Sequence, residues 1–236
     1  MITHFPFEEL GNHNYGWLNA RYHFNFANYY NPNLLPKKPL LVWNDDLIQP
    51  NSGFPMHSHQ NMEIITYIRK GRISHKDNLG NNGEIKEGQV QVMSAGSGIT
   101  HSEYNLSSEE TLLFQIWIEP NKNNIKPTWK NINLANHTNK AIEILASGEL
   151  KYEQSDTLKI QQDASVIRII GQKEIIKYKL HKNRHYYGVV SEGLVNINNM
   201  NKINSRDGFY IQSEDQINFN FLKSSEIILV DMPKII

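Results

Sequence analysis

The sequence predicts an all-β protein built from antiparallel strands. Its apolar segments are short, rich in β-branched and aromatic residues, and bounded by Gly, Asn or Pro. That pattern is typical of a sandwich or a barrel and not of a parallel α/β sheet. Several segments alternate between apolar and polar residues, as half-buried antiparallel strands do. No stretch of useful length shows the 3.6-residue period of an amphipathic helix.

The predicted strands fall into two groups along the chain. In the first half we expect strands at residues 22–26, 39–49, 62–71, 71–77, 88–96 and 111–120. In the second half we expect them at residues 165–171, 174–180, 185–190, 193–198, 208–212, 216–222 and 226–233. The last group is clearest at Ile217, Phe219 and Phe221, which alternate with asparagines. Residues 128–157 show no clear period, so no element is predicted there.

A polar segment bounded by Pro120 and Pro127 separates the two groups and is the best linker candidate. A chain of 236 residues accommodates two β-modules of about a hundred residues each. We therefore expect an N-terminal domain at residues 1–125 and a C-terminal domain at residues 126–236. Both halves contain a strand-glycine-strand hairpin, which suggests a distant internal repeat.

Composition excludes several classes of protein. Lys and Arg together number 24, as do Asp and Glu, so neither nucleic acid nor an anionic membrane is an expected partner. The absence of cysteine excludes disulfides, thiolate metal ligands and cysteine nucleophiles. Without a signal-like N-terminus or a bilayer-length apolar stretch, we expect a cytoplasmic protein. No glycine-rich phosphate loop and no Gly-x-Ser-x-Gly elbow supports nucleotide or serine-hydrolase chemistry.

Two residue pairs within residues 53–105 have the chemistry of metal ligands. His57 and His59 follow a Gly-Phe-Pro turn, while His101 and Glu103 follow a Gly-Ser-Gly turn. Side chains alternate along a strand, so both members of each pair project from one face. A single strand histidine is most often a surface or core residue. If the two strands are neighbours, however, three imidazoles and one carboxylate converge on one point, which suits a divalent transition metal.

Other titratable residues nearby have competing interpretations. Glu63 shares the parity of positions 57 and 59, so it competes with Glu103 as a ligand or else accepts a hydrogen bond from a ligand imidazole. His75 stands beside charged residues and is expected to be solvated. The remaining histidines are interpreted as structural: His4, His13, His23, His137, His181 and His185.

The residues around these pairs resemble a known family. His57-x-His59-x-x-x-Glu63 followed by Gly71 is similar to the first cupin motif, with the glycine spacing one residue longer. Gly98-x-x-His101-x-x-x-Asn105 is similar to the second motif. The stretches FPMHSHQNMEIITYIRKGRISHKDNLGNNG and VQVMSAGSGITHSEYN closely resemble pirins of the bacterial branch related to quercetin 2,3-dioxygenases. The likeness covers nearly the whole chain and is looser in its second half.

This resemblance implies a bicupin, in which two antiparallel, jelly-roll-like β-barrels pack face to face and only the N-terminal barrel binds metal. The pirin ligand positions fall on His57, His59, His101 and Glu103, which leaves Glu63 to line the pocket or support a ligand. We expect one divalent transition-metal ion, with iron first and nickel, cobalt, manganese, copper or zinc as alternatives. Ser58 and Gln60 stand where many relatives have proline and a basic residue. Neither departure removes a ligand.

Two functions of different classes follow from the resemblance. The first is a monomeric, metal-dependent dioxygenase that uses dioxygen to cleave flavonols such as quercetin, with Glu103 or Glu63 accepting the substrate's hydroxyl proton. The alternative is a metal-bound regulatory module that docks on a transcription factor or a metabolic enzyme without turnover, as pirins in animals and some bacterial relatives do. A sugar-binding or isomerase-like cupin ranks third.

Overall fold

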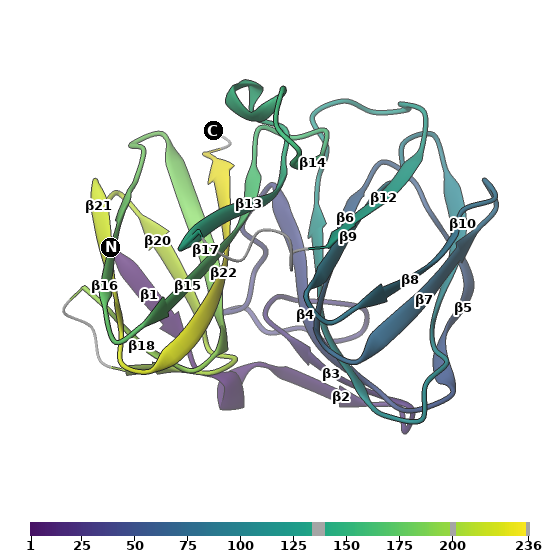
Figure 1. Ribbon diagram of the computed structural model, residues 1–236, viewed down its shortest axis with the longest axis horizontal. Helices are drawn as coiled ribbons and strands as arrows, with labels where there is room; N and C mark the ends of the chain where they lie inside the picture. Colours follow the sequence, from purple (N-terminus) through teal and green to yellow (C-terminus); the bar gives the residue numbers. More distant parts are fainter. Residues whose placement is uncertain (134–139, 199–201, 235–236) are drawn as a thin grey trace. The chain divides into compact units, whose positions relative to one another are not determined.

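The computed structural model describes residues 1–133, 140–198 and 202–234, whose regular structure is almost entirely β-strand (Figure 1). The helical elements among them are two single turns of 3-10 helix, η1 (Phe7–Glu9) and η3 (Leu150–Tyr152). No helix in the described residues has the length and apolar character needed to cross a membrane. The all-β prediction is confirmed.

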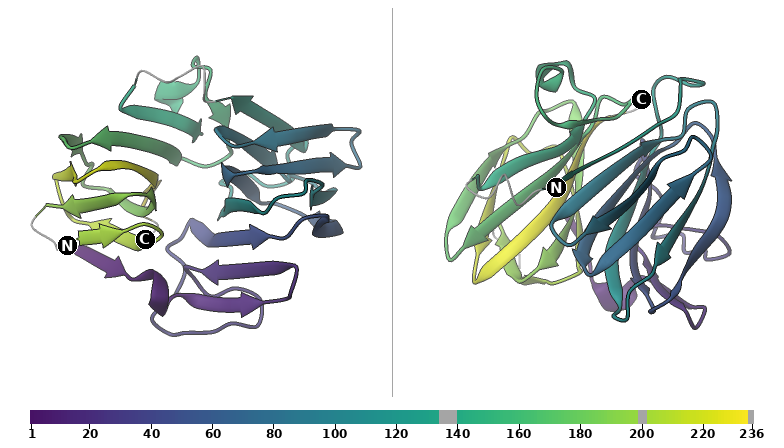
Figure 2. Two further views of the ribbon diagram at one scale, coloured as in Figure 1. Left: turned by 60° about the horizontal axis from the view of Figure 1, so that its bottom comes forward. Right: turned by 45° about the vertical axis from the view of Figure 1, so that its right-hand side comes forward.

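The chain divides into two compact units that are not consecutive stretches of sequence. The N-terminal unit comprises Gly11–Asn136 with Leu158–Gln162, and the C-terminal unit comprises Met1–Leu10, His137–Thr157 and Asp163–Ile236. The first strand belongs to the C-terminal unit because it pairs with a strand around residue 210. In Figure 2 this purple strand lies against the yellow-green strands. The domain boundary at residues 125 and 126 stays a prediction.

The N-terminal unit consists of two antiparallel sheets. The longer sheet has the order β12-β9-β6-β11-β4-β3-β2 and the shorter one the order β5-β10-β7-β8. The longer sheet comprises β2 (Gly11–Asn14), β3 (Leu18–Tyr22), β4 (Leu40–Ile48), β6 (Glu63–Lys70), β9 (Gln89–Ser94), β11 (Thr111–Ile118) and β12 (Thr128–Asn133). The shorter sheet comprises β5 (Ser52–His59), β7 (Arg72–Asp77), β8 (Asn82–Lys86) and β10 (Ile99–Asn105). The short β14 (Leu158–Lys159) completes the unit.

The C-terminal unit is also built from two antiparallel sheets, with strand orders β1-β20-β17-β22-β15-β13 and β16-β21-β18-β19. The first comprises β1 (Ile2–Phe5), β13 (Ile142–Ser147), β15 (Ser165–Gln172), β17 (Arg184–Glu192), β20 (Gly208–Gln212) and β22 (Ser224–Pro233). The second comprises β16 (Ile175–Lys179), β18 (Leu194–Ile197), β19 (Lys202–Asn204) and β21 (Gln216–Phe221).

Alternation along the strands explains the apolar interior of each unit. On β21, Ile217, Phe219 and Phe221 are buried in the core of the C-terminal unit, as their spacing predicted. On β7, Ile73 is buried in the N-terminal core while Arg72 and Lys76 are exposed. Burial of one face per strand is the main favourable contribution to the stability of such a unit.

Two sequence predictions about strands are wrong. The first predicted strand, at residues 22–26, is displaced, because β3 ends at Tyr22 and Asn25 lies in a loop where its side chain accepts the N–H of Asn31 at 2.7 Å. The stretch 128–157, for which no element was predicted, contains β12, β13 and η3. On β12 the side chains are exposed or only half-buried, so the strand lacks the apolar alternation that sequence patterns detect.

Candidate metal centre

The pairing of β5 with β10 brings the two predicted residue pairs together. His57 is the direct Cα partner of His101, and His59 is the partner of Ile99. Ring centroids lie 4.4 Å apart for His57 and His101, 5.1 Å apart for His59 and His101, and 4.8 Å apart for His57 and His59. One ligand atom from each of the three histidines lies within 4.8 Å of the others. The structure thus brings together three of the four predicted ligands as a group.

A β-bulge on β5 sets the direction of these side chains. His57 pairs with His101, yet Glu103, two residues further along β10, pairs with Phe54 instead of Pro55. The extra residue lies in the Pro55–Met56 stretch, where a proline without an N–H is tolerated because the ladder is interrupted. The carbonyl of Pro55 accepts a hydrogen bond from His57 Nδ1–H at 2.7 Å. The bulge therefore fixes the His57 ring and leaves Nε2 with a free lone pair.

Burial keeps two of the imidazoles neutral. It lowers the pKa of His101 to about 3, with His57 and His59 adding to the effect. Burial also lowers the pKa of His59 to about 4, with His57 as a second cause. Neutral imidazole is the form that binds a metal. The Nε2 atom of His101 is buried and has no hydrogen-bond partner, which is costly for a polar atom unless a ligand satisfies it. These donors fit a transition-metal ion.

Glu103 lies beside His101 on the same buried face of β10. Its carboxylate accepts hydrogen bonds from the side-chain amides of Gln91 at 2.7 Å and Gln115 at 2.9 Å, with Thr66 at 3.4 Å. Burial raises its pKa to about 7, although these three donors act in the opposite direction. Glu103 falls in a second group of potential ligands together with His75 and His101. His101 is the residue common to both groups.

Glu63 is not brought to the histidines. It begins β6, and regular pairing of β6 with β9 places Thr66 beside Glu103 but puts Glu63 on the opposite face of the strand. There the Ser94 hydroxyl donates to its carboxylate at 2.6 Å, and burial raises its pKa to about 7. Parity counted from His59 fails because Asn61 has a left-handed φ of +49°, which interrupts the extended backbone between β5 and β6.

The prediction that His75 is solvated is wrong. Its side chain is fully buried, with its ring stacked on Trp129 at a centroid distance of 4.8 Å. Strand alternation is the physical reason, because Ile73, His75 and Asp77 share the inner face of β7 while charged neighbours point outward. The parity with Ile73 was the sequence signal that could have placed it. His75 joins the histidine-rich cluster through a 3.4 Å contact between its Nδ1 and His101 Nδ1.

The other described histidines lie outside both groups of potential ligands. His4 contacts Asp207 at 2.9 Å, and His185 contacts the Tyr210 hydroxyl at 2.6 Å. His137 lies outside the described residues.

A cavity of about 150 Å³ opens beside His57 and His59. Its walls are mainly apolar and aromatic, with a few polar groups. The lining residues are Leu18, Ala20, Tyr22, Phe26, Asn44, Asp46, Phe54, His57, His59, Gln115 and Trp117. Oδ1 of Asn44 and Oδ1 of Asp46 are buried without a hydrogen-bond partner. A mostly apolar pocket with a few convergent polar groups is the usual form of a small-molecule site.

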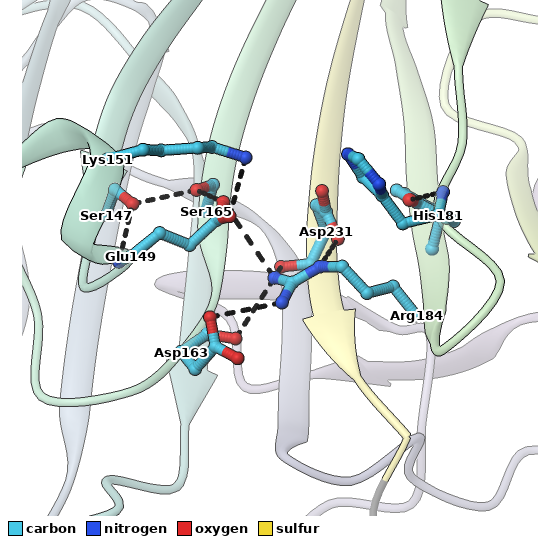
Figure 3. A network of polar contacts seen from close by, with 9 residues as sticks. Ser147, Glu149, Lys151, Asp163, Ser165, His181, Arg184 and Asp231 are labelled. Carbon is cyan, nitrogen blue, oxygen red and sulfur yellow. Dashed lines mark hydrogen bonds and ion pairs between the residues drawn. The ribbon is translucent and has the colours of Figure 1, made fainter.

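The C-terminal unit holds a network of ion pairs (Figure 3), and its described residues include no group of three potential metal ligands. Arg184 on β17 bonds Asp231 on β22 and reaches Asp163 Oδ1 at 3.1 Å. Glu149 accepts from Ser165 and pairs with Lys151 at 2.6 Å. Arg184 and Asp231 have the parity of Tyr186 and Leu229, which belong to the core of this unit. The guanidinium of Arg184 compensates the buried carboxylate of Asp231, so these two charges are paired within the unit.

Comparison with known proteins agrees with this architecture. A model of the Pirin family matches residues 6–118, and a model described as quercetinase C-terminal cupin domain matches residues 144–232. Two all-β units, one of them with a histidine cluster at a cavity, define a bicupin. The chain belongs to the pirin family, and the resemblance identified in the sequence is confirmed.

Individual relatives extend over the whole chain. A pirin-like protein from Caulobacter vibrioides is 47% identical over 234 residues, which cover 98% of this chain and 99% of that protein. A quercetin 2,3-dioxygenase from Escherichia coli K12 is 37% identical, with 96% of each chain covered. The crystal structure of the bacterial pirin YhhW in complex with nickel(II), from Escherichia coli, matches with a TM-score of 0.92 at 36% identity and full coverage of both chains.

Proposed function

We propose that this protein is a metal-dependent dioxygenase that cleaves flavonols such as quercetin oxygenolytically. The observation that carries the proposal is the group of three histidines beside a small, mainly apolar cavity. The quercetin 2,3-dioxygenase name of relatives that cover nearly the full chain supports this substrate class. The domain at residues 1–125 would carry the reaction, and the domain at 126–236 would lack metal ligands.

We assign His57, His59, His101 and Glu103 as the ligands of one divalent transition-metal ion. Imidazole nitrogen with carboxylate oxygen suits iron, which we place first, and equally admits nickel, cobalt, manganese, copper and zinc. The nickel complex of the related YhhW supports a site of this kind. Such an ion supplies Lewis-acid chemistry, which lowers the pKa of a hydroxyl bound to it.

The cavity walls would bind and orient one ring of the substrate. A volume of about 150 Å³ is what an apolar cavity needs to hold a single benzene-sized ring. Trp117 stands edge-on to His59 and to Phe26, with centroid distances of 5.0 and 5.6 Å. These rings offer apolar faces and edges to an aromatic substrate and exclude water from it. The other rings of a flavonol would extend out of the cavity.

Two buried acceptors give the cavity its polar recognition. Asn44 and Asp46 lie two residues apart on β4 and therefore point to the same side of the sheet. Their unpartnered Oδ1 atoms can accept from hydroxyl groups on the bound ring. Burial, with Asp45 and Glu103 nearby, raises the pKa of Asp46 well above its usual value. A protonated Asp46 would also donate a hydrogen bond to a substrate oxygen.

The proton acceptor for the substrate's hydroxyl group is Glu103 or Glu63 in this proposal. Placement favours Glu103, because Glu63 is on the far face of β6. Glu63→Gln and Glu103→Gln form a matched pair that decides between them. We expect oxygen uptake to survive the change at Glu63 and to be lost with the change at Glu103.

The test of the proposed function combines metal analysis with an oxygen-uptake assay on quercetin. We expect purified protein to hold one transition-metal ion per chain and to consume oxygen when quercetin is added. His57→Ala should abolish both, and His181→Ala, a change at an exposed histidine, should leave both unchanged. Metal-loaded protein that gives background oxygen uptake with every flavonol tested would contradict the dioxygenase and favour a regulatory module.

A further inference from the structure

Three buried side chains form a line behind the histidine cluster. Asp77 Oδ2 lies 3.0 Å from His75 Nε2, and His75 Nδ1 lies 3.4 Å from His101 Nδ1. The side chains of His75 and Asp77 have no solvent exposure. All three come from neighbouring strands, since β7 pairs with β10 and His101 is the Cα partner of Asp77. The line therefore ends on the one histidine shared by both groups of potential ligands.

Asp77 is the acceptor in its hydrogen bond with His75. Its Oδ1 accepts the backbone N–H groups of Leu79 at 2.9 Å and Asn81 at 3.0 Å, and its Oδ2 accepts the Asn81 side-chain amide at 2.8 Å. A carboxylate surrounded by donors acts only as an acceptor. The proton between Asp77 and His75 therefore resides on His75 Nε2.

The proton on His75 Nε2 determines which ring nitrogen of His101 is protonated. A neutral imidazole carries one ring proton, so His75 Nδ1 has a lone pair and accepts. The only ring nitrogen of His101 within reach of it is Nδ1, which must then carry the proton of His101. That leaves a lone pair on Nε2 of His101. This is the buried atom for which the structure provides no protein partner.

The His75 ring is held in place from its other side. It stacks on Trp129 with an angle of 13° between the ring planes. The Trp129 indole N–H donates to Gln91 Oε1 at 2.8 Å, and the Gln91 amide donates to Glu103 at 2.7 Å. One connected set of contacts thus orients both His101 and Glu103.

We propose that His75 and Asp77 are positioning residues, which hold His101 in its Nδ1–H tautomer so that Nε2 is its metal-binding atom. The inference rests on the proposed metal centre and adds to it the way in which one ligand is oriented. Partners of this kind fix the tautomer and ring direction of a ligating histidine, and removing one typically lowers metal affinity 10–100-fold.

The decisive substitution is Asp77→Asn, which keeps the shape of the side chain but replaces one carboxylate oxygen by an amide NH2 group. The backbone N–H groups of Leu79 and Asn81 require an oxygen, so Oδ1 stays where it is and the new amide group faces His75 and the Asn81 side chain. The Asn81 amide can turn its own oxygen towards the new donor. The new amide group donates to His75 Nε2, His75 then carries its proton on Nδ1, and His101 is driven to the Nε2–H tautomer. A second pair of variants is His75→Phe, which keeps a flat ring on Trp129, and His75→Asn, whose Oδ1 can replace the acceptor at Nδ1.

The experiment reads the ring nitrogens of 15N-histidine-labelled full-length protein by long-range 1H–15N NMR, first without metal. We expect the Nδ1–H tautomer of His101 in the wild type and in His75→Asn, the Nε2–H tautomer in Asp77→Asn, and a mixture in His75→Phe. Titration with Zn²⁺ or Ni²⁺ should show affinity reduced 10–100-fold in Asp77→Asn and His75→Phe, with near-wild-type affinity in His75→Asn.

Three results would overturn the inference. These are a wild-type His101 in the Nε2–H tautomer, unchanged metal affinity in folded Asp77→Asn and His75→Phe, and 15N shifts in the zinc-loaded protein that identify His75 itself as a ligand. Failure of the metal centre is separate. Wild-type protein that binds neither ion would contradict the proposed function, while the tautomers in metal-free protein would still confirm or refute the hydrogen-bonded line.

Discussion

His57 and His101 face each other as direct partners across β5 and β10, with ring centroids 4.4 Å apart. They come from segments more than forty residues apart in the chain, so the cluster exists only when this strand pair has formed in the correct register. A shift of register by one residue would turn one pair of side chains to the other face of the sheet. The proposed metal binding at this position therefore depends on this strand pairing.

The first prediction concerns the histidines singly and in combination. Each of His57→Ala, His59→Ala and His101→Ala should reduce bound metal to well below one ion per chain, because an ion loses a ligand that the others cannot replace. The double variant His57→Ala with His101→Ala should be little worse than either single one, since ligands of one ion act together. Elemental analysis measures both. Additive losses would contradict a shared ion.

The second prediction concerns the close approach of β5 and β10. A Cβ atom added at Gly53 would lie 2.2 Å from the backbone oxygen of Glu103 and 2.6 Å from Cα of Tyr104. Gly53→Ala must push apart the strands that hold the proposed metal ligands. We expect a stability loss of about 1–3 kcal/mol, typical of overpacking, together with weaker metal binding. Met56→Ala, at an exposed position on the same strand, is the control and should change neither in urea unfolding and metal titration.

The third prediction concerns Asp46. Asp46→Leu replaces a buried carboxyl group, whose Oδ1 has no hydrogen-bond partner, with an apolar side chain of similar size. We expect unchanged or greater thermal stability, because an unsatisfied buried polar group is removed. We also expect KM for hydroxylated flavonols to rise about tenfold, as the loss of one hydrogen bond implies, with metal content unchanged. Reduced stability with unaltered KM would show that Asp46 is structural and not part of substrate recognition.

The sequence predicts a site residue correctly where the side-chain alternation is counted within a single strand. His57 with His59 and His101 with Glu103 were found from two-residue parity, which is local and holds within a strand. The same rule failed for Glu63, because the turn at Asn61 separates it from β5 and starts a new count. For His75 two local signals conflict: its charged neighbours favour a solvated side chain, whereas its parity with Ile73 indicates the buried one that the structure shows.

Features that depend on non-local contacts were outside the reach of sequence patterns. The all-β class and most strands followed from composition and alternation. Pairing of β1 with β20 joins residues about two hundred positions apart, and no local pattern encodes it. The bulge at Pro55 and the Trp129 stack on His75 likewise depend on which strands become neighbours.

The last prediction concerns the pH dependence of stability at Glu63. Burial raises the pKa of this carboxyl from 4.5 in the unfolded chain to about 7 in the fold. Below pH 4.5 Glu63 is protonated in both the folded and the unfolded state, so it does not make the free energy of unfolding depend on pH. As the pH rises towards 7 the unfolded chain ionises first, so the folded state loses stability through this window and the loss is complete above it. The two pKa values correspond to a difference of about 3 kcal/mol.

Glu63→Gln cannot ionise and should not show this loss. We therefore expect its free energy of unfolding to be close to that of the wild type at pH 4.5 and to exceed it by about 3 kcal/mol at pH 8. Urea unfolding of metal-free protein at a series of pH values measures the difference. The same change at the exposed Glu87 serves as the control and should leave the wild-type pH profile in place. A constant difference between Glu63→Gln and the wild type from pH 4.5 to 8 would show that the buried carboxyl does not retain its proton in the fold.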